Sequence, residues 1–152
     1  MHETDVEAAA RIWARAVGRR DGVQPATTAT ARTGIERRLA LDGATLLVDR
    51  QDGHAVGFAL LAPRTGNVEL FYLAVDPDAW GLGVASRLLR RIDERARDLG
   101  HDRLELWVIE DNERAIKTYE RAGWVPTADL QQDPPGSSVE RRFVRTVGPP
   151  AR

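Results

Sequence analysis

The sequence contains no cysteine among its 152 residues. This absence excludes a disulfide framework, a thiolate metal site and a cysteine acyl-enzyme intermediate. Long hydrophobic runs are also missing: no stretch approaches the ~18 consecutive apolar residues that cross a bilayer, and the first thirty residues contain no apolar signal core. We therefore expect a cytoplasmic protein without a membrane partner.

The sequence has no excess of charge of either sign. Its 22 basic residues nearly balance its 23 acidic ones, so no global basic field points to nucleic acid as a partner. Metal ligands are scarce, because neither His54 nor His101 has another histidine or cysteine at ligand spacing. We expect neither a nucleic-acid partner nor a bound metal.

The composition is ordinary for a globular chain, with 42% hydrophobic and 30% charged residues. A length of 152 residues suits one domain with a single sizeable core. No internal repeat is evident in the sequence. We predict one domain over residues 1–147 and a disordered tail at 148–152.

Hydrophobic periodicity predicts alternating helices and strands. Thr4 and Glu7 form a capping box before a helical pattern, whereas the polar stretch 18–34 predicts a loop. Asp52-Gly53 predicts a tight hairpin turn between two strands. The expected helices cover residues 5–17, 35–41, 84–99 and 112–122, and the expected strands cover 44–48, 55–61, 68–75, 103–108, 124–129 and 139–147.

A strand, a glycine-containing loop and a helix follow one another within residues 68–99. Asp76-Pro77 ends the strand, because proline lacks the donor that a central strand needs. Gly81 and Gly83 allow positive φ and keep side chains away from the backbone, so the free amides of the next helical turn can bind phosphate. Two glycines before a helix also fit a tight turn without a ligand, and the loop alone leaves both interpretations open.

A second motif follows the next strand, and the two motifs together resemble the coenzyme-A-binding signature of the GNAT family of N-acetyltransferases. The family pattern is Gln/Arg-x-x-Gly-x-Gly/Ala, followed by Asn-x-x-Ala-x-x-x-Tyr-x-x-x-Gly-Phe. The resemblance covers about residues 44–147 and departs from the pattern at Trp80, where Gln or Arg is usual. The matching segments are Trp80-x-x-Gly83-x-Ala85 and Asn112-x-x-Ala115-x-x-x-Tyr119-x-x-x-Gly123-Trp124.

This resemblance implies the GNAT fold, an α/β domain with a mixed, mostly antiparallel sheet of six or seven strands and about four flanking helices. It implies acetyl-CoA as cosubstrate, with the pantetheine arm between two separated parallel strands and the pyrophosphate on the glycine loop. The family normally begins with a short strand before the first helix, and Met1-His2-Glu3 is too short to supply it, so either that strand is absent or the start of the sequence is truncated. The residues expected to bind acetyl-CoA are Leu73, Ala74, Val75, Gly81, Leu82, Gly83, Val84, Ala85, Ser86 and Asn112.

Two residues are candidates for proton transfer. Periodicity alone makes Tyr119 a core aromatic, whereas the resemblance implies a general acid that protonates the CoA thiolate. Glu69 stands eleven residues before Trp80, the spacing at which histone-type members of the family carry a general base, and a solvated carboxylate at a strand end is the alternative. A branch that acetylates a ribosomal protein carries its base where this chain has Trp107, so that version of the mechanism is not available.

We expect transfer of acetyl from acetyl-CoA to a primary amine by direct attack, with a small molecule as the leading acceptor. Two alternatives share the coenzyme residues: a protein N-terminal or lysine acetyltransferase, and a non-catalytic acyl-CoA-binding module. The sequence does not distinguish these acceptors. It also leaves the oligomeric state open, with a homodimer as one alternative.

Overall fold

The computed structural model describes residues 3–21, 28–132 and 135–148. Within these ranges six strands form one sheet in the order β1-β2-β3-β4-β6-β5. Neighbouring strands are antiparallel except β3 and β4, which are parallel because the chain crosses between them through α3. The strands are β1 Thr45–Gln51, β2 His54–Pro63, β3 Val68–Val75, β4 Arg103–Ile109, β5 Val125–Gln131 and β6 Glu140–Thr146.

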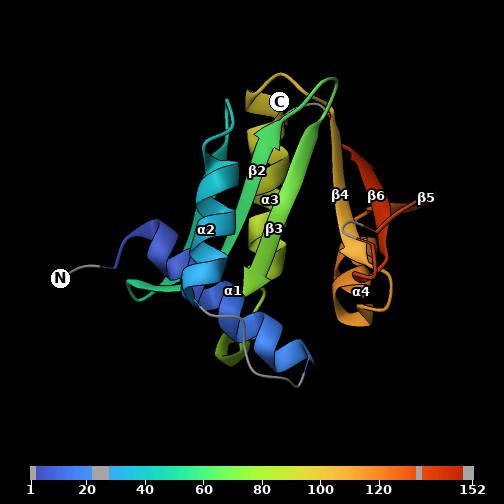
Figure 1. The fold of residues 1–152 in the computed structure, drawn as a ribbon. Helices are drawn as coiled ribbons and strands as arrows, with labels where there is room; N and C mark the ends of the chain where they lie inside the picture. Colours follow the sequence, from blue (N-terminus) through green and yellow to red (C-terminus); the bar gives the residue numbers. More distant parts are fainter. Residues whose placement is uncertain (1–2, 22–27, 133–134, 149–152) are drawn as a thin grey trace.

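Helices cover both faces of the sheet (Figure 1). α1 (Asp5–Asp21) and α2 (Thr28–Leu39) lie over β2 and β3 on one face, and α3 (Val84–Asp98) lies on the other. α4 (Glu113–Arg121) follows β4 and packs into the same core as α3. We call the two sides of the sheet the α1/α2 face and the α3 face. The mixed, mostly antiparallel sheet between helices is the architecture that the sequence predicted.

The hydrophobic core has one part on each face of the sheet. Successive residues of a strand point to opposite faces, so Leu61, Leu70 and Leu106 pack with α3, whereas Phe58 and Leu60 pack with α1 and α2. β2 contributes to both parts, and its residues between the two ends are all buried. β2 is therefore closely packed on both faces, and it holds the neighbouring strand β3 in place.

The predicted loop at residues 18–34 is wrong where the structure describes it. α1 continues to Asp21, and α2 occupies the second half of the segment, while residues 22–27 lie outside the described part. Ala31 and Ile35 are the buried residues of α2, one helical turn apart, and they pack in the core of the α1/α2 face. Two apolar residues are a weak periodic signal, and tertiary packing rather than propensity stabilises this helix.

We expect Ile35→Ala to lower the free energy of unfolding by about 2–5 kcal/mol, the usual cost of removing a large buried side chain. Ile35 is 0% exposed, so the substitution leaves a cavity under α2. The matched control is Arg37→Ala on the exposed side of the same helix. Urea denaturation measures both variants, and equal midpoints would contradict the packing of α2 against the sheet.

The structure confirms two local predictions, the capping box and the hairpin turn. The Glu7 amide donates to Thr4 Oγ1 at 3.1 Å, as the capping box requires. Asp52 and Gly53 adopt φ of 52° and 77°, the left-handed conformation of a tight hairpin turn. No strand precedes α1 in the part of the chain that is described, and no described helix is long and apolar enough to cross a membrane. Most of the predicted disordered tail, residues 149–152, lies outside the described ranges.

Candidate active site

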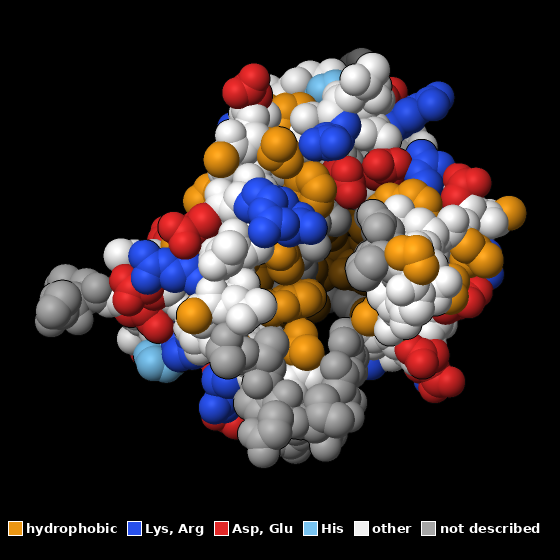
Figure 2. Space-filling view, viewed as in Figure 1, with side chains coloured by type: hydrophobic (Ala, Val, Ile, Leu, Met, Phe, Trp, Pro, Cys, Tyr) orange, Lys and Arg blue, Asp and Glu red, His pale blue; other side chains and the backbone are white. Residues whose placement is uncertain are grey.

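The parallel strands β3 and β4 pair over a short distance and then separate. Val68–Leu70 pairs with Leu104–Leu106, and no further pair joins the two strands, although β3 continues to Val75 and β4 to Ile109. Figure 1 shows the strands diverging toward their carboxyl ends, and Figure 2 shows a hollow with apolar side chains on its floor between the two halves of the sheet. We call this opening the β3–β4 cleft.

The end of β3 presents backbone groups to the cleft. The Asp76 amide donates to the Val56 carbonyl at 2.8 Å, and hydrogen bonds of an antiparallel pair recur at every second residue. Ala74 therefore bonds to β2, whereas the amides and carbonyls of Leu73 and Val75 point toward β4. The sequence proposed all three residues as backbone ligands, and the register turns Leu73 and Val75 toward the opening.

The glycine loop connects β3 to α3 beside the cleft. Gly81 and Gly83 have φ of 84° and 81°, as predicted, and Leu82 between them is exposed. The first helical hydrogen bond runs from the Arg87 amide to the Gly83 carbonyl at 3.1 Å. Earlier amides have no partner inside the helix, and Gly83 has no side chain to cap them. These are the amides of Val84, Ala85 and Ser86.

Tyr119 projects from α4 into the core of the α3 face. Its ring lies 5.9 Å from that of Trp124, centroid to centroid, and the residue is 8% exposed. Burial raises the pKa of the Tyr119 phenol well above its usual range, so the group stays protonated at neutral pH. Its hydroxyl makes no hydrogen bond to a described residue. Among the described residues, Asn67 Oδ1 is the one fully buried side-chain polar atom without a hydrogen-bond partner. The proton of the Tyr119 hydroxyl is therefore not engaged by another described residue.

Glu69 lies on the opposite side of the sheet. It precedes Leu70, which faces α3, so its side chain points to the α1/α2 face. The side chain is 18% exposed, with Arg64 Nε at 3.6 Å from its Oε1. Burial raises the pKa of Glu69 and the charge of Glu105 raises it further, against the opposing effect of Arg64 and Arg38. The Glu69 side chain is therefore partly buried.

The two candidate proton-transfer groups thus lie on different sides of the sheet, with Tyr119 in the core of the α3 face and Glu69 on the α1/α2 face. A molecule in the cleft would have the phenol of Tyr119 on the α3 face and the carboxylate of Glu69 on the α1/α2 face. One group holds its proton at neutral pH, and the other can accept one. This arrangement suits a transfer in which one reactant loses a proton and a leaving group gains one.

Comparison with known proteins identifies the family. Residues 12–124 match the model of the acetyltransferase (GNAT) family. The chain belongs to the GNAT family. The resemblance and the fold that the two sequence motifs indicated are therefore confirmed.

Individual relatives agree with this assignment. The chain is 32% identical over 140 residues to the mycothiol acetyltransferase of Sanguibacter keddieii, covering 84% of this chain and 44% of that protein, so it spans less than half the relative's length. Its fold is that of the ribosomal-protein-S18-alanine N-acetyltransferase of Escherichia coli (TM-score 0.74, 22% identity, 99% and 93% of the two chains). The PaiA N-acetyltransferase of Thermoplasma acidophilum, solved with coenzyme A, is also similar (TM-score 0.70, 15% identity, 96% and 95%).

Trp80, where the chain departs from the GNAT pattern, bridges the two sides of the cleft. Its Nε1 donates to the Val75 carbonyl at 2.9 Å, and the Arg114 guanidinium lies 3.9 Å above its ring. Arg114 belongs to the first turn of α4, whose cap is Asn112, with Oδ1 accepting from the Ala115 amide at 3.3 Å. The sequence predicted this cap but not the stacked arginine, because the two residues meet only in the folded chain.

Among the described residues, Asp76 is the one charged residue that is buried. Arg11 Nη1 and Arg15 Nε of α1 each lie 3.3 Å from its Oδ2, and its Oδ1 accepts from the Asp78 amide at 3.0 Å. The sequence indicated Asp76 only as the end of a strand. Its ion pairs fix the chain between β3 and the glycine loop against α1, which holds the loop in position for this GNAT site.

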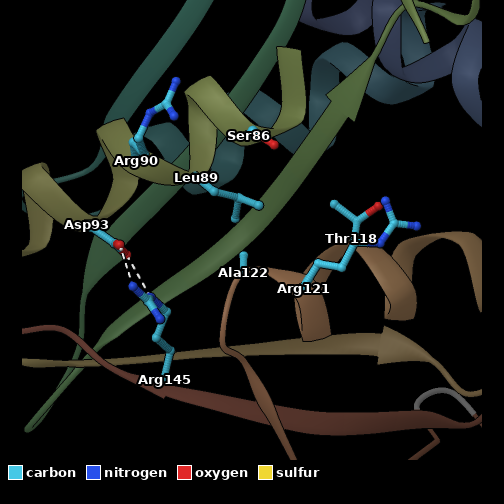
Figure 3. Close-up of a pocket in the computed structure, with 8 residues that line it drawn as sticks. All are labelled: Ser86, Leu89, Arg90, Asp93, Thr118, Arg121, Ala122 and Arg145. Carbon is cyan, nitrogen blue, oxygen red and sulfur yellow. Dashed lines mark hydrogen bonds and ion pairs between the residues drawn. The ribbon is translucent and has the colours of Figure 1, made fainter. Parts of the chain in front are cut away.

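A second hollow, of about 240 Å³, lies between α3 and α4 (Figure 3). The Asp93–Arg145 ion pair closes one end at 2.8 Å, and Leu89 and Ala122 face each other across it. No group of three or more metal-ligating side chains occurs in the described ranges. The residues lining the hollow are Ser86, Leu89, Arg90, Asp93, Thr118, Arg121, Ala122 and Arg145.

Proposed function

We propose that this GNAT-family chain transfers the acetyl group of acetyl-CoA to a primary amine. The observation that carries the proposal is the placement of Tyr119 and Glu69 on opposite faces of the sheet in which the β3–β4 cleft opens. A thioester in the cleft would then meet the amine from one side and a proton donor from the other. Such positioning converts a bimolecular reaction into an effectively unimolecular one.

The coenzyme would lie along the cleft with its pyrophosphate at the start of α3. Free helix amides and the positive end of the helix dipole favour an anion at that place. An added Cβ at Gly81 would meet no atom within 4 Å, so the space over this part of the loop is open. The proposed coenzyme contacts are the backbone of Leu73, Ala74 and Val75, the loop and first turn formed by Gly81, Leu82, Gly83, Val84, Ala85 and Ser86, and Asn112.

The reaction needs three proton transfers. Glu69, directly or through water, takes the proton of the substrate ammonium, and the amine nitrogen then attacks the thioester carbonyl. The new C–N bond forms as the C–S bond breaks, and Tyr119 gives its proton to the departing thiolate. The nitrogen then loses its second proton, which returns through water to the tyrosinate and leaves a neutral amide. Backbone amides of β3 orient the thioester, and no covalent enzyme intermediate is required.

For the acceptor we propose a small-molecule amine. A relative named for mycothiol rather than for a protein supports this class. The experiment is an assay of CoA release with a panel of small amines and of peptides with free N-termini or lysines. Turnover with peptides alone would point to a protein acetyltransferase, and absence of turnover with acetyl-CoA still bound would point to a binding module.

We expect Gly83→Val to weaken acetyl-CoA binding by about 1–3 kcal/mol, the scale of lost hydrogen bonds to a charged group. Gly83 has φ of 81°, so a β-branched side chain strains the loop and enters the space proposed for the pyrophosphate. Isothermal titration calorimetry measures the change.

The control for Gly83→Val is Gly53→Val in the β1–β2 hairpin turn. Gly53 has φ of 77° and no atom near an added Cβ, so this variant introduces similar backbone strain far from the cleft. It should bind acetyl-CoA like the wild type. A folded Gly83→Val protein with unchanged affinity would remove the phosphate role of the loop.

A further inference from the structure

Glu69 has a second carboxylate directly beside it. Glu105 is its register partner on the parallel strand β4, and neighbouring strands lie about 4.8 Å apart. Both side chains face the α1/α2 side, because Leu70 and Leu106, the residues that follow them, face α3. Their exposed fractions are 18% and 17%. The two carboxylates therefore lie side by side on the α1/α2 face, both partly buried, at the last part of the sheet where β3 and β4 are still paired.

The two carboxylates differ in how firmly they are held. Glu105 Oε2 accepts a hydrogen bond from Arg142 Nε of β6 at 2.7 Å, and Arg142 also approaches Asp129 at 3.4 Å. Glu69 has only a 3.6 Å ion pair with the more exposed Arg64 and no hydrogen bond to a described residue. Glu105 is thus a fixed anion, whereas Glu69 retains free lone pairs that can take a proton.

We propose that Glu105, held in place by Arg142, is a positioning residue that keeps Glu69 able to accept a proton from the substrate. The inference rests on the proposed function, in which Glu69 is the base. A base must bind a proton strongly enough to take it from an ammonium and must still be ionised when the substrate arrives. Burial is the larger cause of the raised pKa of Glu69, the negative charge of Glu105 at the neighbouring strand position adds to it, and Arg142 limits that addition.

The other charges around Glu69 set the direction of each test. Arg64 from the β2–β3 turn and Arg38 from α2 lower the pKa of Glu69, whereas Glu105 from β4 and, less strongly, Glu140 from β6 raise it. Neutralising Glu105 must therefore move the titration of Glu69 to lower pH. Neutralising Arg142 leaves Glu105 without its cation and must move the same titration to higher pH.

The experiment is an NMR titration of the full chain labelled with ¹³C at the glutamate carboxyl groups. Three proteins are compared: wild type, Glu105→Gln and Arg142→Gln, with Glu69→Gln used to assign the signal. We expect the Glu69 midpoint to fall in Glu105→Gln and to rise in Arg142→Gln. Opposite shifts from two neighbouring residues are not produced by a general loss of packing.

The same variants are then assayed for kcat/KM against pH. At the pH where the wild type has half of its plateau activity, Glu105→Gln should approach its full plateau and Arg142→Gln should fall well below half. Coincident NMR midpoints in the three proteins, or shifts in the same direction, would overturn the inference. Opposite NMR shifts with an unmoved kinetic profile would show instead that Glu69 is not the base, which is a failure of the proposed function. If Glu105→Gln does not fold, Glu140→Gln replaces it, with a smaller downward shift expected.

Discussion

Tyr119→Phe is expected to lower kcat by about 10²-fold, the scale of a lost general acid, with little change in the affinity for acetyl-CoA. The phenylalanine ring can keep the contact with Trp124 and most of the buried area. What is lost is the hydroxyl, which bonds to no described residue and whose pKa is raised by burial. A group that remains protonated at neutral pH can give its proton to a thiolate but contributes little to binding before the reaction.

The measurement combines steady-state kinetics with calorimetric titration of acetyl-CoA. Tyr72→Phe is the matched control, because Tyr72 is the other tyrosine of the sequence and its hydroxyl accepts from Arg38 Nη1 at 3.2 Å on the α1/α2 face. This variant should keep kcat within a few-fold of the wild type. If Tyr119→Phe also turns over normally, Tyr119 is a core aromatic and the thiolate obtains its proton elsewhere.

Glu69→Gln should lower kcat/KM at neutral pH by about 10²-fold, because the variant cannot accept the ammonium proton. An amine with the pKa of lysine is about 0.1% neutral at pH 7.4, so removal of its proton at the site matters. Burial and Glu105 raise the pKa of Glu69, and the wild type must lose activity as the pH falls through this raised value. That acidic limb should be absent in Glu69→Gln.

The pH profile of both proteins with one good amine decides the role of Glu69. Activity of the variant should recover at high pH, where the substrate arrives already neutral. Glu120→Gln, an exposed glutamate on α4, is the control and should reproduce the wild-type curve. Two profiles of the same height and shape for wild type and Glu69→Gln would assign the base to water or to another residue.

Most of the regular structure could be predicted from the sequence, because its signals are local. The Asn112 cap and the Asp52-Gly53 turn depend on residues within a few positions of each other, and both were predicted. The helix at α2 was missed over most of its length. Its two buried residues, Ala31 and Ile35, become meaningful only when α1 and the sheet lie beside them.

Contacts between distant segments account for what the sequence did not indicate in the candidate site. Glu105 and Arg142 are 37 residues apart, and Trp80 meets Arg114 from another element. Nothing in the periodicity of either strand or helix marks such pairs, since each residue alone looks like an ordinary polar or aromatic surface residue. Their partners follow from strand order and register.

The sequence by itself determined which residues carry the GNAT motifs, because glycine conformation, helix capping and motif spacing are properties of short segments. Tertiary structure alone decided how these residues face one another. Pairing between β3 and β4 ends at Leu70 and Leu106, which opens the cleft. The alternation of side chains along β3 then turns Glu69 to the α1/α2 face, because a strand residue points to one side or the other only once its neighbours have fixed the register. The packing of α4 puts Tyr119 in the core of the α3 face.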